Sequence, residues 1–373
     1  MKEILGAEPF YFNQEKKILK KIGDIISSKQ LSSGKYVKQF EKDFSNLVNA
    51  KYSIAVSSGG TALETALEAL GVVGKDILIP AQTFIATANA VIRAGGNPIF
   101  CDIERSTGCL DPEDILKKIT KKTSGIIFVP MFGVMPDSIL KIKKICKKNK
   151  LFLMEDAAHA HGASIKNIKA GNVGDISVFS FYATKILTTG EGGMITTNNK
   201  KLNEKCLKLR NHGRSLKNNL FEMYGNNFRL SEIHALIGIY QLRNIKKSIK
   251  HRNRLAKIYN QSFTDVNLFE KFKFYKYSEN SFWRYPLYLN KKINRSKLQK
   301  NLAEKFKIRI TWMYEPLCHH QPSFKNRNKA ELPVAEKAIK ELINLPTHLN
   351  VSISDAKKIS NFLILECKNL YND

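Results

Sequence analysis

The chain of 373 residues has no apolar run long enough to cross a membrane, and residues 1–9 lack the long apolar region of a secretory signal. Its six cysteines are scattered and form no Cys-x-x-Cys pair, which favours reduced thiols over a disulfide framework. Neither His159 with His161 nor the adjacent His319 and His320 is followed by further ligands at regular zinc spacing. We therefore expect a cytoplasmic protein with no membrane span and no catalytic metal.

Acidic residues are also scarce, with 33 Asp and Glu against 61 Lys and Arg, giving a formal charge of +28. Such an excess raises the possibility of a nucleic-acid-binding protein held by phosphate neutralisation. The lysines, however, are spread over amphipathic segments such as residues 141–150 and are not gathered with aromatics into a recognition element. We expect no nucleic-acid partner, and a positive field would equally attract a nucleotide-sugar diphosphate.

Apolar runs of strand length alternate with helical patterns from about residue 50 to 200, which predicts an α/β fold with a mostly parallel sheet sandwiched by helices. A helical stretch from Leu230 to about Tyr259 then leads to aromatic-rich strands, such as residues 282–288, and closing helices near 335–342 and 353–370. The length is compatible with two domains. We place a large domain at residues 1–255 and a smaller α+β domain at residues 256–373.

Lys185 follows the apolar run 176–182 and precedes the glycine-rich stretch 188–193. Burial at that place would disfavour the ammonium form and leave a nucleophilic amine able to form a Schiff base with an aldehyde cofactor. The segment alone is equally compatible with a lysine at a strand end whose head reaches water.

Asp156 ends a second apolar run, residues 151–155, where α/β sheets place ligands at the carboxyl ends of strands. A facing acid and an amine-bearing lysine are what pyridoxal phosphate requires. By itself, Asp156 is also a good helix N-cap.

Residues 55–67 predict a strand end, a glycine turn and a helix whose amino terminus suits a phosphate. An ordinary strand-to-helix turn explains these residues too, and no Walker pattern follows.

Together, these segments resemble the DegT/DnrJ/StrS family of sugar aminotransferases, a branch of the fold-type-I pyridoxal phosphate enzymes. The matching segments, in chain order, are residues 31–41, 55–67, 80–90, 151–162, 176–193, 209–213 and 225–230. The resemblance implies that Lys185 is the Schiff-base lysine and Asp156 the partner of the pyridine nitrogen. It also implies that His159 touches the cofactor's phenolic oxygen and that Phe84 stacks on its ring, whereas composition alone favours Phe84 as a core aromatic.

The resemblance further assigns the cofactor phosphate to Gly60 and Thr61, with an equivalence that is uncertain by one residue, and to the hydroxyl of Ser180. It implies that Asn227 crosses a homodimer interface to the neighbouring subunit's phosphate, so that active sites are shared. From the residues alone, Ser180 is a strand serine and Asn227 a turn former.

The implied reaction is transamination of a keto group on a nucleotide-linked sugar, with glutamate or glutamine as donor, for amino-sugar biosynthesis in a surface glycan such as lipopolysaccharide or in a secondary metabolite. His212, Arg229 and Tyr314 are the expected substrate contacts. Residues 311–322 depart from the family, because an arginine is absent and the spacing after Leu317 is one residue longer, which affects sugar preference. A related dehydratase would have histidine in place of Lys185, and a regulatory, non-enzymatic homologue would have lost that lysine or Asp156.

Overall fold

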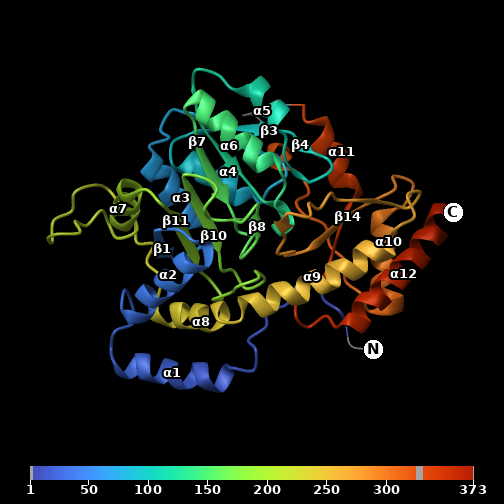
Figure 1. Ribbon diagram of the computed structural model, residues 1–373, viewed down its shortest axis with the longest axis horizontal. Helices are drawn as coiled ribbons and strands as arrows, with labels where there is room; N and C mark the ends of the chain where they lie inside the picture. Colours follow the sequence, from blue (N-terminus) through green and yellow to red (C-terminus); the bar gives the residue numbers. More distant parts are fainter. Residues whose placement is uncertain (1–2, 325–330, 373) are drawn as a thin grey trace.

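The computed structural model describes residues 3–324 and 331–372, and Figure 1 shows a large sheet packed among helices. The sheet has seven strands in the order β1-β11-β10-β7-β6-β2-β3. The strands are, in that order, β1 (Tyr52–Val56), β11 (Gly193–Thr197), β10 (Ile176–Ser180), β7 (Phe152–Asp156), β6 (Thr123–Phe128), β2 (Asp76–Pro80) and β3 (Asn97–Cys101). Only β11 runs against its neighbours, so the prediction of a mostly parallel sheet is confirmed.

The central strands are apolar on both faces. Ile77, Leu78 and Ile79 of β2 are all fully buried, and successive strand side chains point to opposite faces, so helices cover the sheet on both sides. α3 (Gly59–Leu70) packs on β10 and β11, α4 (Ile85–Arg93) on β2 and β3, and α6 (Ser138–Asn149) on β6 and β7. Because the parallel strands share a direction, β7 and β10 end at the same edge of the sheet.

The remaining elements of this part of the chain are short or peripheral. They are α1 (Glu15–Ser27), α2 (Lys35–Val48), β4 (Ile103–Glu104), β5 (Cys109–Leu110), α5 (Pro112–Lys118), η1 (Met131–Gly133), β8 (Ser164–Ile165), β9 (Ile168–Lys169) and α7 (Lys200–Leu209). Within residues 3–324 and 331–372, no helix combines the length and apolarity that crossing a membrane requires.

The long helical stretch expected from Leu230 is two helices, α8 (Glu232–Leu242) and α9 (Ile245–Ser262). The break falls at Asn244, whose side chain bonds to the carbonyl of Tyr240 and so competes with regular backbone pairing. α9 carries the chain from beneath the large sheet towards the carboxyl-terminal region (Figure 1). The boundary at residue 255 falls inside this helix, and we retain the division into 1–255 and 256–373 as a proposal.

The carboxyl-terminal region is built on a three-stranded antiparallel sheet with the order β12-β14-β15. The strand expected at 282–288 begins later, because Phe282 has a positive φ of 44° that a regular strand does not allow. The elements of this region are β12 (Phe269–Lys271), β13 (Ser278–Glu279), β14 (Tyr285–Leu289), α10 (Arg295–Phe306), η2 (Cys318–His320), α11 (Pro333–Glu341), β15 (Leu342–Leu345) and α12 (Ile353–Asn372). α12 packs on α9 and α10, which closes the α+β unit.

Candidate active site

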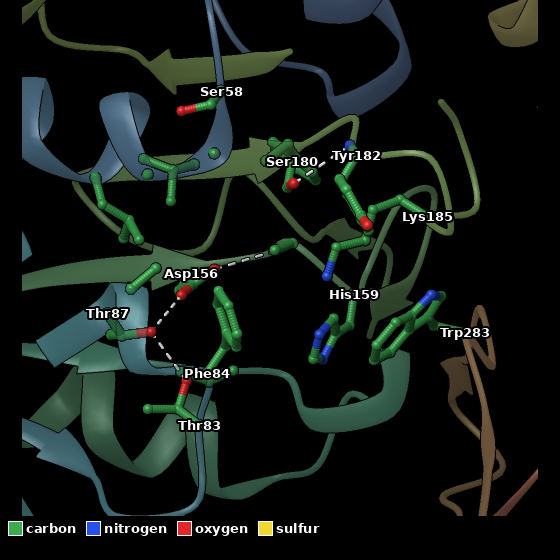
Figure 2. A pocket seen from close by; sticks show the side chains of 18 of the residues that line it. Ser58, Thr83, Phe84, Thr87, Asp156, His159, Ser180, Tyr182, Lys185 and Trp283 are labelled. Carbon is green, nitrogen blue, oxygen red and sulfur yellow. Dashed lines mark hydrogen bonds between the residues drawn. The ribbon is translucent and has the colours of Figure 1, made fainter. Parts of the chain in front are cut away.

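A cavity of about 550 Å³ lies at the carboxyl ends of β7 and β10 (Figure 2). Its walls combine the start of α3, the start of α4, the end of β7 and the segment that follows β10 with two pieces of the carboxyl-terminal region, around Trp283 and Tyr314. Side chains from distant parts of the sequence therefore converge on one space.

Lys185 reaches this cavity from the turn after β10, where its backbone N–H donates to the carbonyl of Tyr182 at 2.9 Å. Its Nζ lies 4.3 Å from the centre of the Trp283 ring, and the Trp283 indole N–H donates to the carbonyl of Thr184 at 2.8 Å. Burial lowers the pKa of Lys185 to about 7, a shift that Asp156 opposes and Arg284 reinforces. The amine is thus available as a nucleophile near neutral pH, and it does not extend into bulk water.

Asp156, the last residue of β7, is almost fully buried at the base of the cavity. One carboxylate oxygen accepts from the Thr87 hydroxyl at 2.8 Å and the other from the backbone N–H of Ala158 at 3.3 Å. Burial raises the pKa of this carboxyl, while the Thr87 bond and the charge of Lys185 oppose the shift. Residues 157–163 form turns and no helix, so the N-cap interpretation is wrong.

His159 and Phe84 form the next part of the wall. The His159 ring stacks on Trp283 with centroids 4.0 Å apart, and its Nε2 shares a hydrogen bond of 2.9 Å with the Tyr314 hydroxyl. Burial holds the pKa of His159 well below its usual range, so the imidazole is neutral. Phe84 is 56% exposed and directs its ring into the cavity, so it is not a core aromatic (Figure 2).

The amino terminus of α3 supplies a cradle of backbone N–H groups. Ser58 caps the helix, and its side chain and that of Thr61 bond to each other's backbone N–H, both at 3.0 Å. A Cβ on Gly59 would lie 2.6 Å from the Cβ of Ser180, so glycine is needed for this close approach. Ser58, Gly59, Gly60 and Ser180 line the cavity, whereas Thr61 serves the cap instead.

Besides Thr61, three predicted residues lie outside the cavity formed by one chain: His212, Asn227 and Arg229. Asn227 is exposed and pairs through its backbone with Asn211, whose side chain accepts from Arg229. His212 is also exposed and has a positive φ of 59°. All three belong to the segment between α7 and α8, whose loop extends away from the body of the molecule (Figure 1), while its end at Arg229 pairs with Val56 of β1.

Sequence reasoning missed Thr87, Trp283 and Arg284. Thr87 stands in the segment 80–90 that carries the family resemblance, but its bond to Asp156 spans 69 positions, and no local signal indicates it. Trp283 and Arg284 belong to the aromatic strand region, and nothing in their local sequence links them to Lys185. Arg284 is buried, its Nε and Nη1 have no hydrogen-bond partner among the described residues, and burial lowers its pKa to about 10.

Comparison with known proteins extends the resemblance over the chain. The DegT/DnrJ/EryC1/StrS aminotransferase family matches residues 13–363. A GDP-perosamine synthase from Vibrio cholerae is 31% identical over 371 residues, which is 98% of each chain. A UDP-4-amino-4,6-dideoxy-N-acetyl-beta-L-altrosamine transaminase from Helicobacter pylori is 30% identical over 372 residues, again 98% of each. The structure of Helicobacter pylori PseC, an aminotransferase involved in the biosynthesis of pseudoaminic acid, matches with a TM-score of 0.90 at 28% identity and covers 99% of this chain and 100% of that one.

The family resemblance and the fold type inferred from scattered segments are both confirmed by these matches. The family match and the structural match both include the carboxyl-terminal region, although residues 311–322 depart from the family's sequence pattern. Because sequence and structure match along nearly the entire chain, we conclude that it is an aminotransferase belonging to the DegT/DnrJ/EryC1/StrS family.

Proposed function

We propose that this aminotransferase uses pyridoxal 5'-phosphate to transfer an amino group from glutamate or glutamine to a keto group of a nucleotide-linked sugar. The observation that carries the proposal is the pairing, in one cavity, of a lysine whose pKa is lowered to about 7 with a buried carboxylate (Figure 2). Such a pair supplies both groups that the cofactor needs from the protein.

The residues present fit this cofactor. Asp156 would hold a proton on the ring nitrogen, and the Thr87 bond fixes its carboxylate for that contact. Phe84 offers a ring face inside the cavity, and the N–H groups of Gly59 and Gly60, at the first two positions of α3, suit a phosphate at a helix amino terminus. When bound, pyridoxal phosphate supplies an aldehyde and a ring that accepts electrons from the substrate carbon.

Lys185 has two roles in this proposal. Its neutral amine provides the covalent attachment, and once displaced it moves a proton to or from the substrate carbon as a general acid and base. Trp283 restricts where that amine lies, because it contacts Nζ with its ring face and bonds to the neighbouring Thr184 through its N–H. The neutral His159, bonded to Tyr314, would present a polar edge to the phenolic oxygen of the cofactor.

The substrate class rests on the relatives and on charge. Two relatives are named for sugars carried by GDP and by UDP, so amino-sugar biosynthesis on a nucleotide carrier is the shared feature. Arg284, which lies over the ring of the cavity-lining Trp283 and whose Nε and Nη1 lack hydrogen-bond partners among the described residues, and the overall charge of +28 favour an anionic substrate. We place the reaction in the cytoplasm.

The active unit in this proposal is a homodimer. His212, Asn227 and Arg229 lie at the two ends of a segment that exposes apolar side chains between them, with Tyr224 100% and Phe221 66% exposed. Such exposure on a projecting segment is typical of a protein interface. A second copy of the chain would cover it and receive these polar residues at its own cavity.

The test combines spectroscopy with a substrate panel. Purified protein with the cofactor should absorb near the edge of the visible range, and borohydride should fix the cofactor on Lys185, as peptide mass spectrometry would show. Keto sugars linked to GDP, UDP and dTDP are then assayed for amination that depends on glutamate or glutamine. A deoxy-sugar product without nitrogen incorporation would instead indicate a dehydratase, and a colourless protein that shifts DNA in a salt-dependent way would favour the nucleic-acid reading.

A further inference from the structure

A cluster of possible metal ligands lies outside the cavity, where η2 meets the first turn of α11. The imidazoles of His319 and His320 both face one carboxylate oxygen of Glu336, with Nε2 to Oε1 distances of 3.1 and 3.6 Å. The three ligand atoms lie within 4.8 Å of one another. His319 is only 4% exposed.

The two separations from Glu336 are close to those between ligands in the first shell of a zinc ion, and the third pair of ligand atoms lies within 4.8 Å. Ligands about 2.0–2.1 Å from a tetrahedral centre are about 3.3 Å from one another, which lies between the two measured separations. Two histidines with one glutamate also form a ligand set that zinc uses with water in the fourth position. A rotation of the exposed His320 side chain would bring all three donors within reach of one ion.

A hydrogen bond explains only part of the arrangement. It accounts for the 3.1 Å contact of His319 with Glu336, whereas the 3.6 Å separation from His320 is too long for a hydrogen bond and within the range of an ion pair. Two ring nitrogens nevertheless converge on the same oxygen, and the rings lie 3.9 Å apart between centroids. An ion held by all three groups accounts for both contacts.

The position of the cluster gives such an ion a structural role. Cys318, next to His319, donates its backbone N–H to Ala81 at 3.1 Å and its thiol to Thr83 at 3.2 Å. The residues just before it, Met313 and Tyr314, line the cavity. An ion would therefore join the end of this cavity-lining segment to α11.

The partner helix is itself fixed. The carboxylate of Asp102 accepts the backbone N–H groups of Val334 and Ala335 at 3.0 and 2.7 Å, so the start of α11 is anchored to the large domain. The extra residue after Leu317, by which the sequence departs from the family spacing, falls in the stretch that bears both histidines.

We propose that His319, His320 and Glu336 bind one zinc ion, with water as the fourth ligand, and that the ion fixes segment 313–320 against α11. The ion would not take part in transamination. The proposal therefore concerns a structural metal and leaves the expectation of no catalytic metal unchanged. The proposal is independent of the cofactor and of the sugar substrate.

The test is zinc binding to the full-length protein after treatment with a chelator and its removal. Calorimetric titration with zinc should show one ion per chain, and cobalt(II) should give the visible absorption of a tetrahedral site. His320→Ala and Glu336→Gln should each abolish stoichiometric binding, and both positions are partly exposed, so the fold should tolerate the change. The matched controls His234→Ala and Glu304→Gln, on α8 and α10, should bind as the unaltered protein does.

A second measurement separates a structural ion from a loosely held one. Zinc should slow amide hydrogen exchange in residues 313–320 and raise the melting temperature of the unaltered protein, because a ligand bound only by the folded state stabilises it. Neither change should occur in His320→Ala. The proposal is overturned if the unaltered protein fails to bind one zinc ion, if His320→Ala binds as well as the controls, or if bound zinc leaves exchange in this segment unchanged.

Discussion

The sheet edge that bears Asp156 and Lys185 differs sharply from the segment that bears Asn227. At the sheet edge, polar groups are buried, fixed by neighbours and turned into one cavity. Beyond α7, His212 and Asn227 are exposed, and large apolar side chains such as Tyr224 face outward. In the proposed homodimer, the first region would hold the reacting groups and the second would contact the partner subunit.

The largest expected effect tests the sheet edge. Lys185→Ala should reduce transamination by about a thousandfold or more, since a positioned proton-transfer group alone contributes about 10²- to 10⁴-fold. Lys185→Arg should be equally inactive, because a guanidinium keeps the charge but supplies no neutral amine. Activity is measured as nitrogen transfer to the keto sugar. The control is Lys143→Ala, on the exposed face of α6, which should be fully active. If Lys185→Ala retained activity, the proposed function would lose its basis.

A mixing experiment tests the outer segment. Asn227→Ala should have strongly reduced activity, and dimers that combine one Asn227→Ala chain with one Lys185→Ala chain should recover part of it. The recovery is expected because one cavity in such a dimer has its own Lys185 and an intact Asn227 from the partner subunit. Co-expression with two affinity tags isolates the mixed dimer for assay. If both residues serve the same chain's cavity, the mixed dimer is as inactive as its parents.

The support of Asp156 should have a smaller effect. Thr87→Val removes the hydroxyl that bonds to the buried carboxylate, and a hydrogen bond to a charged group contributes about 1.5–3 kcal/mol. We expect kcat/KM to fall by about tenfold or somewhat more, since each 1.4 kcal/mol corresponds to a factor of ten. Thr87→Ser keeps the hydroxyl and should retain most of the activity. Equal rates for the valine and serine variants would show that the bond does not position Asp156.

The sheet edge was also the easier region to predict from sequence. Asp156 ends an apolar run and Lys185 closely follows one, and parallel neighbouring strands bring such ends together. Trp283 was not predictable, because its contact with Thr184 spans 99 positions and depends on how the carboxyl-terminal region docks. Glu336 likewise approaches His319 only in the folded chain, 17 positions away.

The glycine turn before α3 shows the limit of a local motif. The family resemblance assigns the cofactor phosphate to Gly60 and Thr61, with an equivalence uncertain by one residue. In the structure, Ser58, Gly59 and Gly60 line the cavity and Thr61 completes the cap of α3. Serine and threonine both cap helices well, so composition alone does not fix which hydroxyl does so. The register of the turn depends instead on the close approach of Gly59 to Ser180.

The smallest expected effect concerns the charge balance around Lys185, and it is read without cofactor or substrate. Burial lowers the pKa of this amine to about 7 from an ordinary 10.5, so its labelling by an amine-specific reagent should rise with pH through about 7 as the neutral form appears. Asp156→Asn removes a charge that favours the ammonium form, which should move the midpoint to lower pH. Arg284→Met removes a charge that disfavours it, which should move the midpoint to higher pH. Mass spectrometry of the labelled peptide measures both midpoints, and shifts in the same direction would show that these charges do not set the reactivity of Lys185.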